Sequence, residues 1–197
     1  MPPQHALVVE NLALARGDRT LFSGFSLRLD AGELVHLTGR NGAGKTSLLE
    51  AIAGLRAPEA GLLHAPPAEV LHWIGHKNGL HPALSAVENL TFWCGLAGAD
   101  AAGVGPVLDR LQLKAARHRP SRTLSTGQKR RTALARLLLQ SRPWWILDEP
   151  LAGLDVQGAE LFAGLVAEHR AHGGAVLLTS HQALPTACGA VRDVPLT

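Results

Sequence analysis

Apolar residues occur along the chain in two alternating patterns. Short apolar runs bounded by turn residues predict strands, and longer segments with apolar residues at helical spacing predict helices. The strands are expected at about 6–12, 25–29, 33–38, 144–147 and 175–179. The helices are expected at about 46–55, 85–97, 106–117, 127–141 and 156–172. This alternation predicts an α/β fold with a largely helical middle third.

The ends of several predicted helices carry recognisable residues. Ser85 begins a capping-box pattern, and Asp155 can cap the helix that follows it. Gly173–Gly174 is expected to end that helix before a buried strand. The stretch 95–105 is rich in Ala and Gly and fits either a loop or a loose helical connection. The apolar face of the first helix is expected to consist of Leu48, Leu49, Ile52 and Leu55.

Length and composition fit one folded domain. The 197 residues are 46% hydrophobic with a net charge of +3, whereas disordered chains have fewer apolar residues and a larger net charge. No apolar run approaches the roughly 18 residues that a membrane-spanning helix needs, and Met1–His5 lacks a signal-peptide pattern. Cys94 and Cys188 are isolated and make no disulfide framework. These features predict a protein of the reducing cytoplasm.

Positive charge is concentrated in one block of the chain. Between Arg110 and Leu147 there is no Asp or Glu. The basic residues of this block are Arg110, Lys114, Arg117, Arg119, Arg122, Lys129, Arg130, Arg131, Arg136 and Arg142. The block is expected to face something negatively charged.

The strongest chemical motif lies between the predicted strand at 33–38 and the helix after it. Eight residues match G-x-x-x-x-G-K-[ST], a phosphate-binding loop in its required context. Backbone N–H groups of such a loop point at the β-phosphate, Lys45 neutralises the β- and γ-phosphates, and the Thr46 hydroxyl binds Mg²⁺. A glycine-rich turn with an incidental lysine is the alternative. The expected nucleotide-binding residues are Gly39, Arg40, Asn41, Gly42, Ala43, Gly44, Lys45, Thr46 and Ser47.

Acidic and histidine side chains follow two buried strands. Ligands of α/β sheets bind at the carboxyl ends of strands, so Asp148 is placed to hold Mg²⁺ or its water. Glu149 projects in another direction and can accept a proton from water attacking the γ-phosphorus. His181 follows the strand at 175–179 and is expected at the same sheet edge. Taken alone, such strand-end residues are also compatible with a structural role.

A further motif precedes the basic helix at 127–141. Ser125, within the stretch Leu124–Gln128, can cap this helix, and the first helical amides can bind an anion. Capping is the simpler interpretation of Ser125 when this motif is considered alone.

The order of these motifs resembles the ATP-binding cassette (ABC) ATPase family over essentially the whole chain. The motifs are the phosphate loop, the signature at 124–128, the Walker B end at Asp148, the D-loop at 151–155 and the switch histidine His181. The resemblance implies one ABC ATPase domain over 1–197. Its core sheet would be mostly parallel, with an N-terminal antiparallel β portion and a helical subdomain at about 78–142.

The resemblance also implies how ATP is bound and hydrolysed. Two copies would associate head to tail, and each ATP would lie between the phosphate loop of one copy and the signature of the other. Asp155 would link the two sites, and Lys45, Glu149 and His181 would be catalytic through positioning and charge stabilisation. The residues expected to face the ATP of the opposite subunit are Ser125, Thr126, Gly127 and Gln128.

Three positions depart from the family pattern. Thr126 stands where the family has Gly and adds a β-branched side chain beside the bound phosphate. Lys77 occupies the Q-loop position of a glutamine, and an ammonium group cannot bind Mg²⁺. Either Asn78 supplies a carboxamide instead, or Lys77 contacts the γ-phosphate. Arg16 lies near the position where the family has an aromatic residue that stacks on adenine. The Arg16 guanidinium can stack on the base instead, so the preference for ATP over GTP is left open. We expect altered coupling rather than inactivity.

Several stretches are similar to the ATP-binding subunits of bacterial cytochrome c maturation (haem exporter) transporters. These stretches are Arg19–Phe22, Trp73–His76, Ala133–Leu137, Trp145–Pro150 and Ser180–Gln182. The similarity implies a peripheral subunit on the cytoplasmic face of the bacterial inner membrane that drives haem export or the release of a haem-loaded chaperone. Its partners would be polytopic membrane subunits, a second copy of itself and a haem chaperone within the complex.

Other functions stay open at this point. Another small ABC exporter would carry the same motifs. A soluble ABC ATPase acting on nucleic acid or ribosomes would use the acid-free block, but such relatives carry tandem cassettes or coiled-coil insertions, so no nucleic acid is expected. A small P-loop kinase has no reason to contain the signature, the D-loop and the strand-end histidine. Scattered histidines such as His72, His76 and His81 are not expected to bind haem.

Overall fold

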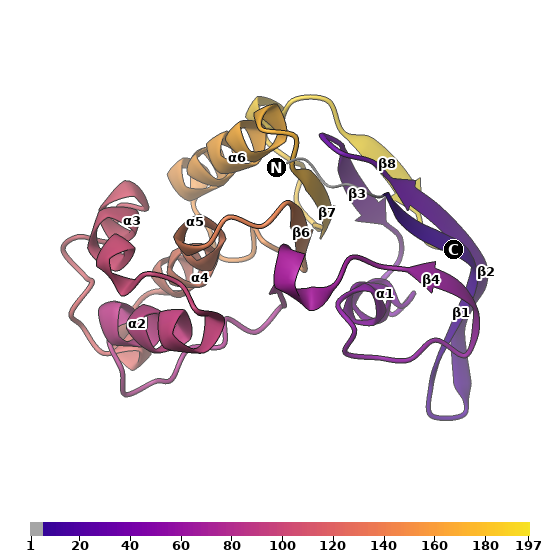
Figure 1. The fold of residues 1–197 in the computed structure, drawn as a ribbon, viewed down its shortest axis with the longest axis horizontal. Coiled ribbons are helices and arrows are strands. Elements are labelled where there is room, and N and C mark those ends of the chain that lie inside the picture. The colour runs from indigo at the N-terminus through magenta and orange to yellow at the C-terminus, as the bar shows by residue number, and fades with distance from the viewer. Residues whose placement is uncertain (1–5) are drawn as a thin grey trace. The chain divides into compact units, whose positions relative to one another are not determined.

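The computed structural model describes residues 6–197 and divides them into two compact units. Met1–His5, the segment considered for a signal peptide, lies outside the described residues. Unit 1 comprises the chain up to Gly75 together with Arg142–Glu149 and Ala163–Thr197, and unit 2 comprises His76–Ser141 and Pro150–Phe162. The strands belong to unit 1, and most of the helices belong to unit 2 (Figure 1).

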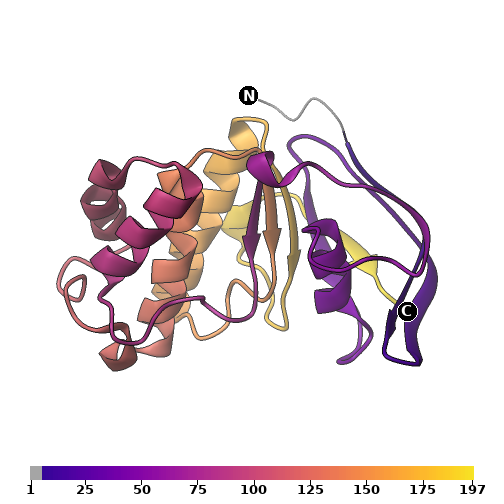
Figure 2. The same cartoon turned by 60° about the horizontal axis from the view of Figure 1, so that its bottom comes forward.

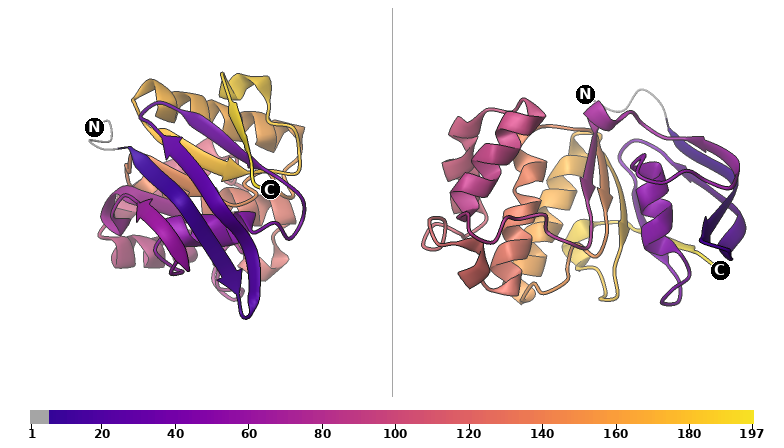
Figure 3. Two further views of the ribbon diagram at one scale, coloured as in Figure 1. Left: turned by 90° about the vertical axis from the view of Figure 1, so that its right-hand side faces the viewer. Right: turned by 90° about the horizontal axis from the view of Figure 1, so that it is seen from below.

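The N-terminal part of unit 1 is a three-stranded antiparallel sheet with the order β2-β1-β4. β1 pairs with β2 from Leu7 opposite Leu29 to Arg16 opposite Arg19, so the two strands form one long hairpin (Figure 3, left). The strands are β1 (Leu7–Arg16), β2 (Arg19–Leu29) and β4 (Ala60–His64). The predicted antiparallel β portion is confirmed, although β4 was not predicted because its residues are mostly exposed and lack an alternating pattern.

The second sheet of unit 1 has five parallel strands in the order β5-β6-β7-β3-β8. The strands are β3 (Leu34–Thr38), β5 (Leu71–Ile74), β6 (Trp144–Leu147), β7 (Ala175–Thr179) and β8 (Arg192–Pro195). β6 and β7 are buried at every position, as continuous apolar runs in a parallel sheet should be. Figure 2 shows these two strands side by side in the sheet. Because parallel strands end at the same edge, the segments after β3, β6 and β7 converge there.

One hydrophobic core joins the two sheets of unit 1 to helix α1 (Lys45–Ile52). Leu48, Leu49 and Ile52 are fully buried in it, which anchors the helix that follows the phosphate loop. Burying one such side chain stabilises a fold by about 1.5–3 kcal/mol. Leu55 was expected on the same face, but α1 ends at Ile52 and the Leu55 side chain is 65% exposed.

Unit 2 is built from helices that pack around α2. The predicted capping box at its start is present, because Ser85 Oγ accepts from the Glu88 amide and Glu88 Oε2 accepts from the Ser85 amide. The helices are α2 (Ala86–Ala97), α3 (Val104–Arg110), α4 (Thr126–Leu134) and α5 (Arg136–Leu139). Short 3-10 helices are η1 (Ala68–Val70) in unit 1, η2 (Ala101–Gly103) and η3 (Ser121–Thr123) in unit 2, and η4 (Thr186–Cys188) in unit 1.

Several predicted boundaries were wrong for identifiable backbone reasons. The helix expected at 106–117 ends at Arg110, since Gln112 has a φ of 58°. The helix expected at 127–141 is divided into α4 and α5 at Ala135. The predicted end of the helix at 85–97 is instead confirmed, because α2 ends at Ala97 and Gly98 follows it with a φ of 67°.

The last helix, α6 (Val156–Ala171), follows Asp155 as predicted. Asp155 Oδ1 accepts a 2.8 Å hydrogen bond from the Gly158 amide, and Gly173, with a φ of 81°, lies just beyond the helix end. The division between the two units falls inside α6, between Phe162 and Ala163. Across residues 6–197, none of the helices combines the length and apolar character that crossing a bilayer requires.

Candidate nucleotide-binding site

The phosphate loop connects β3 to α1 in a conformation that requires glycine at two places. Gly39 has a φ of 142°, and a Cβ there would lie 2.5 Å from the Leu196 carbonyl oxygen. Gly44 has a φ of 102°, and a Cβ there would lie 2.9 Å from the Phe22 ring. Both distances are shorter than real Cβ contacts, so Leu196, which follows β8, and Phe22 of β2 pack directly against the loop backbone.

Lys45 is folded into this loop. Its Nζ donates to the Gly39 carbonyl at 2.7 Å and to the Arg40 carbonyl at 3.1 Å, and the residue is only 9% exposed. The ammonium group is therefore held against the loop backbone, next to the amides that can bind phosphate. Of the other predicted nucleotide-binding residues, Arg40, Asn41, Gly42 and Thr46 are exposed, and Ala43, Gly44 and Ser47 are half-buried.

Asp148, after β6, is held by two hydroxyl groups from other segments. Thr46 Oγ1 donates to Asp148 Oδ2 at 2.9 Å, and Thr179 Oγ1 donates to Asp148 Oδ1 at 2.7 Å. Asp148 is 2% exposed, so its carboxylate is fixed in a mostly dry environment. The structure thus brings together the two residues expected to hold Mg²⁺.

Glu149 points to the histidine that follows β7. Its Oε2 accepts a 3.0 Å hydrogen bond from the His181 amide, and its Oε1 lies 3.5 Å from His181 Nε2. The Glu149 side chain is 14% exposed, whereas that of His181 is 58% exposed. The two residues therefore form a pair with the histidine ring on the open side.

The backbone of Glu149 has an unusual conformation. Its φ of 52° lies in the left-handed region, which a non-glycine residue rarely adopts without support. The support is a 3.0 Å hydrogen bond from the Glu149 amide to Thr179 Oγ1. This conformation directs adjacent acidic side chains to different partners, Asp148 to Thr46 and Glu149 to His181.

Two residues of this network were missed from the sequence. Thr179 is fully buried at the end of β7, where it resembled an ordinary strand residue. His36, on β3, lies 2.9 Å from Asp193 Oδ1 through Nδ1 and 3.1 Å from the Ser180 carbonyl through Nε2. It thereby fixes the residue directly before His181. A polar residue in an apolar strand was the only signal for either.

Arg16, the candidate for stacking on adenine, lies at the end of the β1–β2 hairpin. It is exposed, and Gly17 beside it turns the chain with a φ of 60°. Its guanidinium is open to solvent, which a stacking role requires.

The signature residues begin helix α4 in unit 2. Ser125 Oγ accepts from the Gln128 amide at 3.1 Å, and Gln128 Oε1 accepts from the Ser125 amide at 3.0 Å. Ser125 therefore does cap the helix, and the capping box occupies the Gln128 side-chain oxygen. The first amides of α4 remain at a positively polarised helix end, where an anion can bind.

The signature packs against the D-loop within unit 2. A Cβ at Gly153 would come within 2.5 Å of Thr126 Cγ2, and a Cβ at Gly127 would come within 2.8 Å of the Gly153 carbonyl oxygen. The methyl group of Thr126 thus lies on the Gly153 backbone. Thr126 stands where the family has glycine, and its side chain fits there because the D-loop residue opposite it, Gly153, has no side chain.

The Q-loop residues have different surroundings. Asn78 Oδ1 accepts a 3.2 Å hydrogen bond from Arg130 Nη1, and the Arg130 Nε donates to the Pro150 carbonyl. The Asn78 carboxamide oxygen is therefore already used inside unit 2. The Lys77 side chain is exposed.

The donor set in unit 1 fits a magnesium site. One carboxylate and one hydroxyl, Asp148 and Thr46, suit a hard cation that takes few protein ligands and completes its shell with water and phosphate oxygens. Among residues 6–197, no group of three or more His, Cys, Asp or Glu side chains is arranged to hold a metal.

Comparison with known proteins identifies the family. Residues 22–152 match the model of the ABC transporter family. The chain belongs to this family. It is 45% identical over 177 residues to the "Cytochrome c biogenesis ATP-binding export protein CcmA" of Hyphomonas neptunium, covering 90% of each chain. It is 42% identical to the protein of that name from Rhodopseudomonas palustris (strain BisB5), covering 92% of this chain and 94% of the relative.

Solved structures agree with the assignment to the ABC transporter family. A structure described as the ATP-binding subunit of an ABC transporter superposes with a TM-score of 0.81 at 25% identity, covering 90% of this chain and 80% of that one. A putative ABC transporter ATP-binding protein from Pyrococcus furiosus shares the fold, with a TM-score of 0.82 at 20% identity and 98% coverage of both chains. The resemblance found in the sequence is confirmed, and the chain is an ATP-binding ABC ATPase that couples hydrolysis to transport.

Proposed function

We propose that this chain is the ATP-hydrolysing subunit of an ABC export complex of cytochrome c biogenesis. Its similarity to proteins named for that role, over nearly the full length of both chains, supports the biological assignment. The observation that carries the catalytic assignment is the pair formed by Glu149 and His181, next to Asp148, whose carboxylate accepts a hydrogen bond from Thr46 of the phosphate loop. Membrane attachment would be peripheral, through polytopic partner subunits at the cytoplasmic face of the bacterial inner membrane.

In the proposed reaction, Lys45 and the loop amides bind the β- and γ-phosphates of ATP. Thr46 and Asp148 would hold Mg²⁺, which neutralises charge on these phosphates when bound. Residues from Gly39 to Ser47 position the triphosphate, and Arg16 stacks on the base. Nearly all of the rate enhancement in such a site comes from positioning and electrostatics.

Glu149 is the proposed general base for the attacking water. Its Oε1 lies beside the His181 ring, so a water bound to this carboxylate can lose a proton to it while His181 stabilises the γ-phosphate. The hydrogen bond from the His181 amide keeps Oε2 occupied and orients the carboxylate. Thr179 positions Asp148 and Glu149 without touching substrate.

A second copy of the chain completes the proposed site. Ser125, Thr126, Gly127 and Gln128 would contact the ATP of the opposite copy through the exposed start of α4, and Asp155 would link the two sites. The cargo is haem or a haem-loaded chaperone, handled by the membrane subunits. Lys77 would either contact the γ-phosphate or act in coupling to those subunits, because the Asn78 oxygen already has a partner in Arg130.

Replacement of the proposed base, Glu149, tests both the catalytic assignment and the assignment to cytochrome c biogenesis. Glu149→Gln keeps an acceptor for the His181 amide but removes the base, so ATP turnover should fall by about 100-fold or more while ATP binding persists. Glu160→Gln, on the exposed side of α6, is the matched control and should leave turnover unchanged.

The same two variants should be introduced into the source cell and its c-type cytochromes measured. Loss of cytochrome c with Glu149→Gln but not with Glu160→Gln supports the assignment to cytochrome c biogenesis. Normal cytochrome c in a strain whose ATPase is inactive would contradict it and favour another small ABC exporter.

A further inference from the structure

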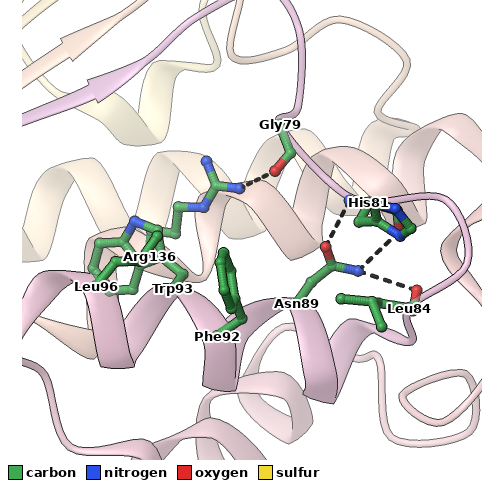
Figure 4. Close-up of a pocket in the computed structure, with 8 residues that line it drawn as sticks. All are labelled: Gly79, His81, Leu84, Asn89, Phe92, Trp93, Leu96 and Arg136. Carbon is green, nitrogen blue, oxygen red and sulfur yellow. Dashed lines mark hydrogen bonds between the residues drawn. The ribbon is translucent and has the colours of Figure 1, made fainter.

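Polar side chains with little solvent exposure hold a loop in each unit. In unit 2, the Asn89 side chain accepts from the His81 amide at 2.7 Å and donates to the Leu84 carbonyl at 3.0 Å (Figure 4). In unit 1, His36 has the corresponding role for the turn that follows β7. The two loops differ in content, because the turn in unit 1 carries one residue of the proposed catalytic pair, His181.

His36 lies at the centre of β3, between the two strands that bring its partners. β3 is paired with β7 on one side and with β8 on the other, and His36 stands opposite Leu178 and Asp193. Asp193 Oδ1 lies 2.9 Å from His36 Nδ1, and the Ser180 carbonyl oxygen lies 3.1 Å from Nε2. The His36 side chain is only 14% exposed. Its ring therefore links β8 to the turn after β7, across the strand that leads into the phosphate loop.

The two partners of His36 fix the direction of its hydrogen bonds. A carbonyl oxygen can only accept, so Nε2 carries a hydrogen and donates it to the Ser180 carbonyl. The Asp193 carboxylate is likewise an acceptor, and it faces Nδ1. Because the Asp193 side chain is 69% exposed, this ion pair contributes little stability by itself. Its effect is to hold the ring in the orientation that directs Nε2 at the turn.

The acceptor of the His36 hydrogen bond belongs to the same peptide group that binds the proposed base. The peptide between Ser180 and His181 consists of the Ser180 carbonyl and the His181 amide. The carbonyl accepts from His36, and the amide donates to Glu149 Oε2 at 3.0 Å. Peptide resonance couples the two ends, so a donor at the carbonyl strengthens the bond made by the N–H. The contacts therefore form a continuous chain of hydrogen bonds from Asp193 to Glu149.

The turn after β7 has its own local bonds as well. Ser180 Oγ donates to the Gln182 carbonyl at 2.7 Å and accepts from the Gln182 amide at 3.0 Å. These bonds set the curvature of the turn, whereas the bonds with His36 and Glu149 fasten it to β3 and to the end of β6. Rotation of the peptide before His181 would break both of the latter bonds and would turn the His181 ring away from Glu149 Oε1.

We propose that His36 is a positioning residue for ATP hydrolysis, which acts on Glu149 through the peptide between Ser180 and His181. Donation by His36 polarises and orients this peptide. The peptide N–H then holds Glu149 Oε2, so that Oε1 is directed to the attacking water. The inference rests on the proposed function, because it takes Glu149 as the base.

Replacement of the His36 ring in the full chain tests the inference. His36→Leu removes the donor to the Ser180 carbonyl, so kcat for ATP should fall by about 10-fold while KM changes by less than about twofold. His36→Gln places an amide donor near the position of Nε2 and should recover most of kcat. Arg192→Gln is the matched control on β8, because Arg192 donates to the Arg28 carbonyl and to Glu33 rather than to the turn. Its kcat should be that of the wild type.

A second variant tests the other end of the chain of hydrogen bonds. Asp193→Ala, at an exposed position, removes the carboxylate that orients the ring and should lower kcat by about threefold. This variant keeps the inference testable if His36→Leu does not fold. Wild-type kcat with both His36→Leu and Asp193→Ala would overturn the inference. An equal fall of kcat with Arg192→Gln would also overturn it, because loosening of β8 would then be the cause.

A double variant shows whether His36 acts through Glu149. In the Glu149→Gln background, single-turnover hydrolysis of labelled ATP should fall by less than about twofold when His36→Leu is added. A further fall of about 10-fold would show that the two residues act independently, and it would overturn the inference.

The amide proton of His181 gives a readout that does not depend on turnover. In a ¹H–¹⁵N spectrum of the full chain without nucleotide, His36→Leu should move this resonance upfield, because a weaker hydrogen bond to Glu149 deshields the proton less. His36→Gln and Arg192→Gln should leave it near its wild-type position. An unmoved resonance with His36→Leu would overturn the proposed polarisation of the peptide.

The Glu149→Gln variant separates the inference from the proposed function. If Glu149→Gln hydrolyses ATP at the wild-type rate, the proposed base is wrong and the inference fails with it. If Glu149→Gln is inactive while His36→Leu and Asp193→Ala keep wild-type kcat, the inference alone is overturned.

Discussion

Thr179 donates a 2.7 Å hydrogen bond to Asp148, and the same hydroxyl accepts the amide of the next acidic residue, Glu149. One buried oxygen therefore positions the carboxylate expected to hold Mg²⁺ and supports the left-handed backbone of the proposed base. The two acidic residues are thus positioned by a residue that is itself fully buried.

Replacing Thr179 tests this arrangement. Thr179→Val keeps the shape of the side chain but removes both hydrogen bonds, so we expect kcat to fall about 10-fold or more, with a loss of stability of about 1–3 kcal/mol from the unpaired Glu149 amide. Thr179→Ser retains the hydroxyl and should restore most of kcat. The kinetics should be measured over a range of Mg²⁺ concentrations, because a misplaced Asp148 raises the Mg²⁺ requirement. If Val and Ser variants lose stability equally and keep wild-type kcat, Thr179 is only a packing residue.

The contact between signature and D-loop predicts coupled effects at Thr126 and Gly153. Gly153→Ala places a Cβ 2.5 Å from Thr126 Cγ2 at a φ of 76°, so it should destabilise the protein by about 2–3 kcal/mol. In a Thr126→Gly background the clash with the Thr126 methyl group is absent. The loss of stability caused by Gly153→Ala should then fall to about 1 kcal/mol, the cost of a positive φ at alanine. Urea unfolding of the single and double variants measures this coupling. Additive losses would show that the two residues do not press on each other.

Lys77 is predicted to act in coupling rather than in nucleotide binding. Lys77→Gln removes the positive charge of this exposed Q-loop side chain, so stimulation of ATP hydrolysis by the membrane subunits should change about two- to fivefold. Nucleotide affinity of the isolated chain should change by less than about twofold. A larger loss of affinity for ATP than for ADP would instead place Lys77 on the γ-phosphate. Unchanged turnover and transport in the assembled complex would leave Lys77 without a distinct role.

The partly buried His169 side chain leads us to expect that the protein loses stability in mild acid. Its ring stacks on Trp145 with centroids 3.8 Å apart and planes 7° from parallel. Burial lowers the pKa of His169 from 6.5 to about 4. Between these pH values His169 binds a proton in the unfolded chain but not in the folded chain. The stability that neutral His169 gives the folded state is therefore complete above pH 6.5 and is lost as the pH falls toward 4.

Solvent partly screens the His169 ring, which reduces the loss of stability expected in acid. The His169 ring is not fully buried, so we expect a loss of about 1–2 kcal/mol rather than the full value of the pKa shift. Urea unfolding at pH 7 and pH 5 should show a smaller pH dependence for His169→Gln than for the wild type. Equal pH dependence of the two proteins would assign the acid sensitivity to other groups.

Local sequence determined the phosphate loop, the buried strands β6 and β7 and the capped starts of α2, α4 and α6. Each depends on residues within a few positions of one another, such as the glycines before Lys45 or the pair Ser125 and Gln128. Their order along the chain was specific enough to indicate the ABC family. The short strands β4, β5 and β8 escaped prediction because none of them is a continuous apolar run like β6.

Tertiary structure alone decided which of these residues meet. Thr179 and Asp148 are 31 positions apart, Thr46 and Asp148 are 102 apart, and His36 and Ser180 are 144 apart. Such bonds form because parallel strands deliver distant segments to one edge, and no local pattern records them. In unit 2, the buried Asn89 side chain likewise donates to Ser121 Oγ, 32 positions away. The sequence by itself therefore determined the chemistry available to this protein, and folding decided which groups act together.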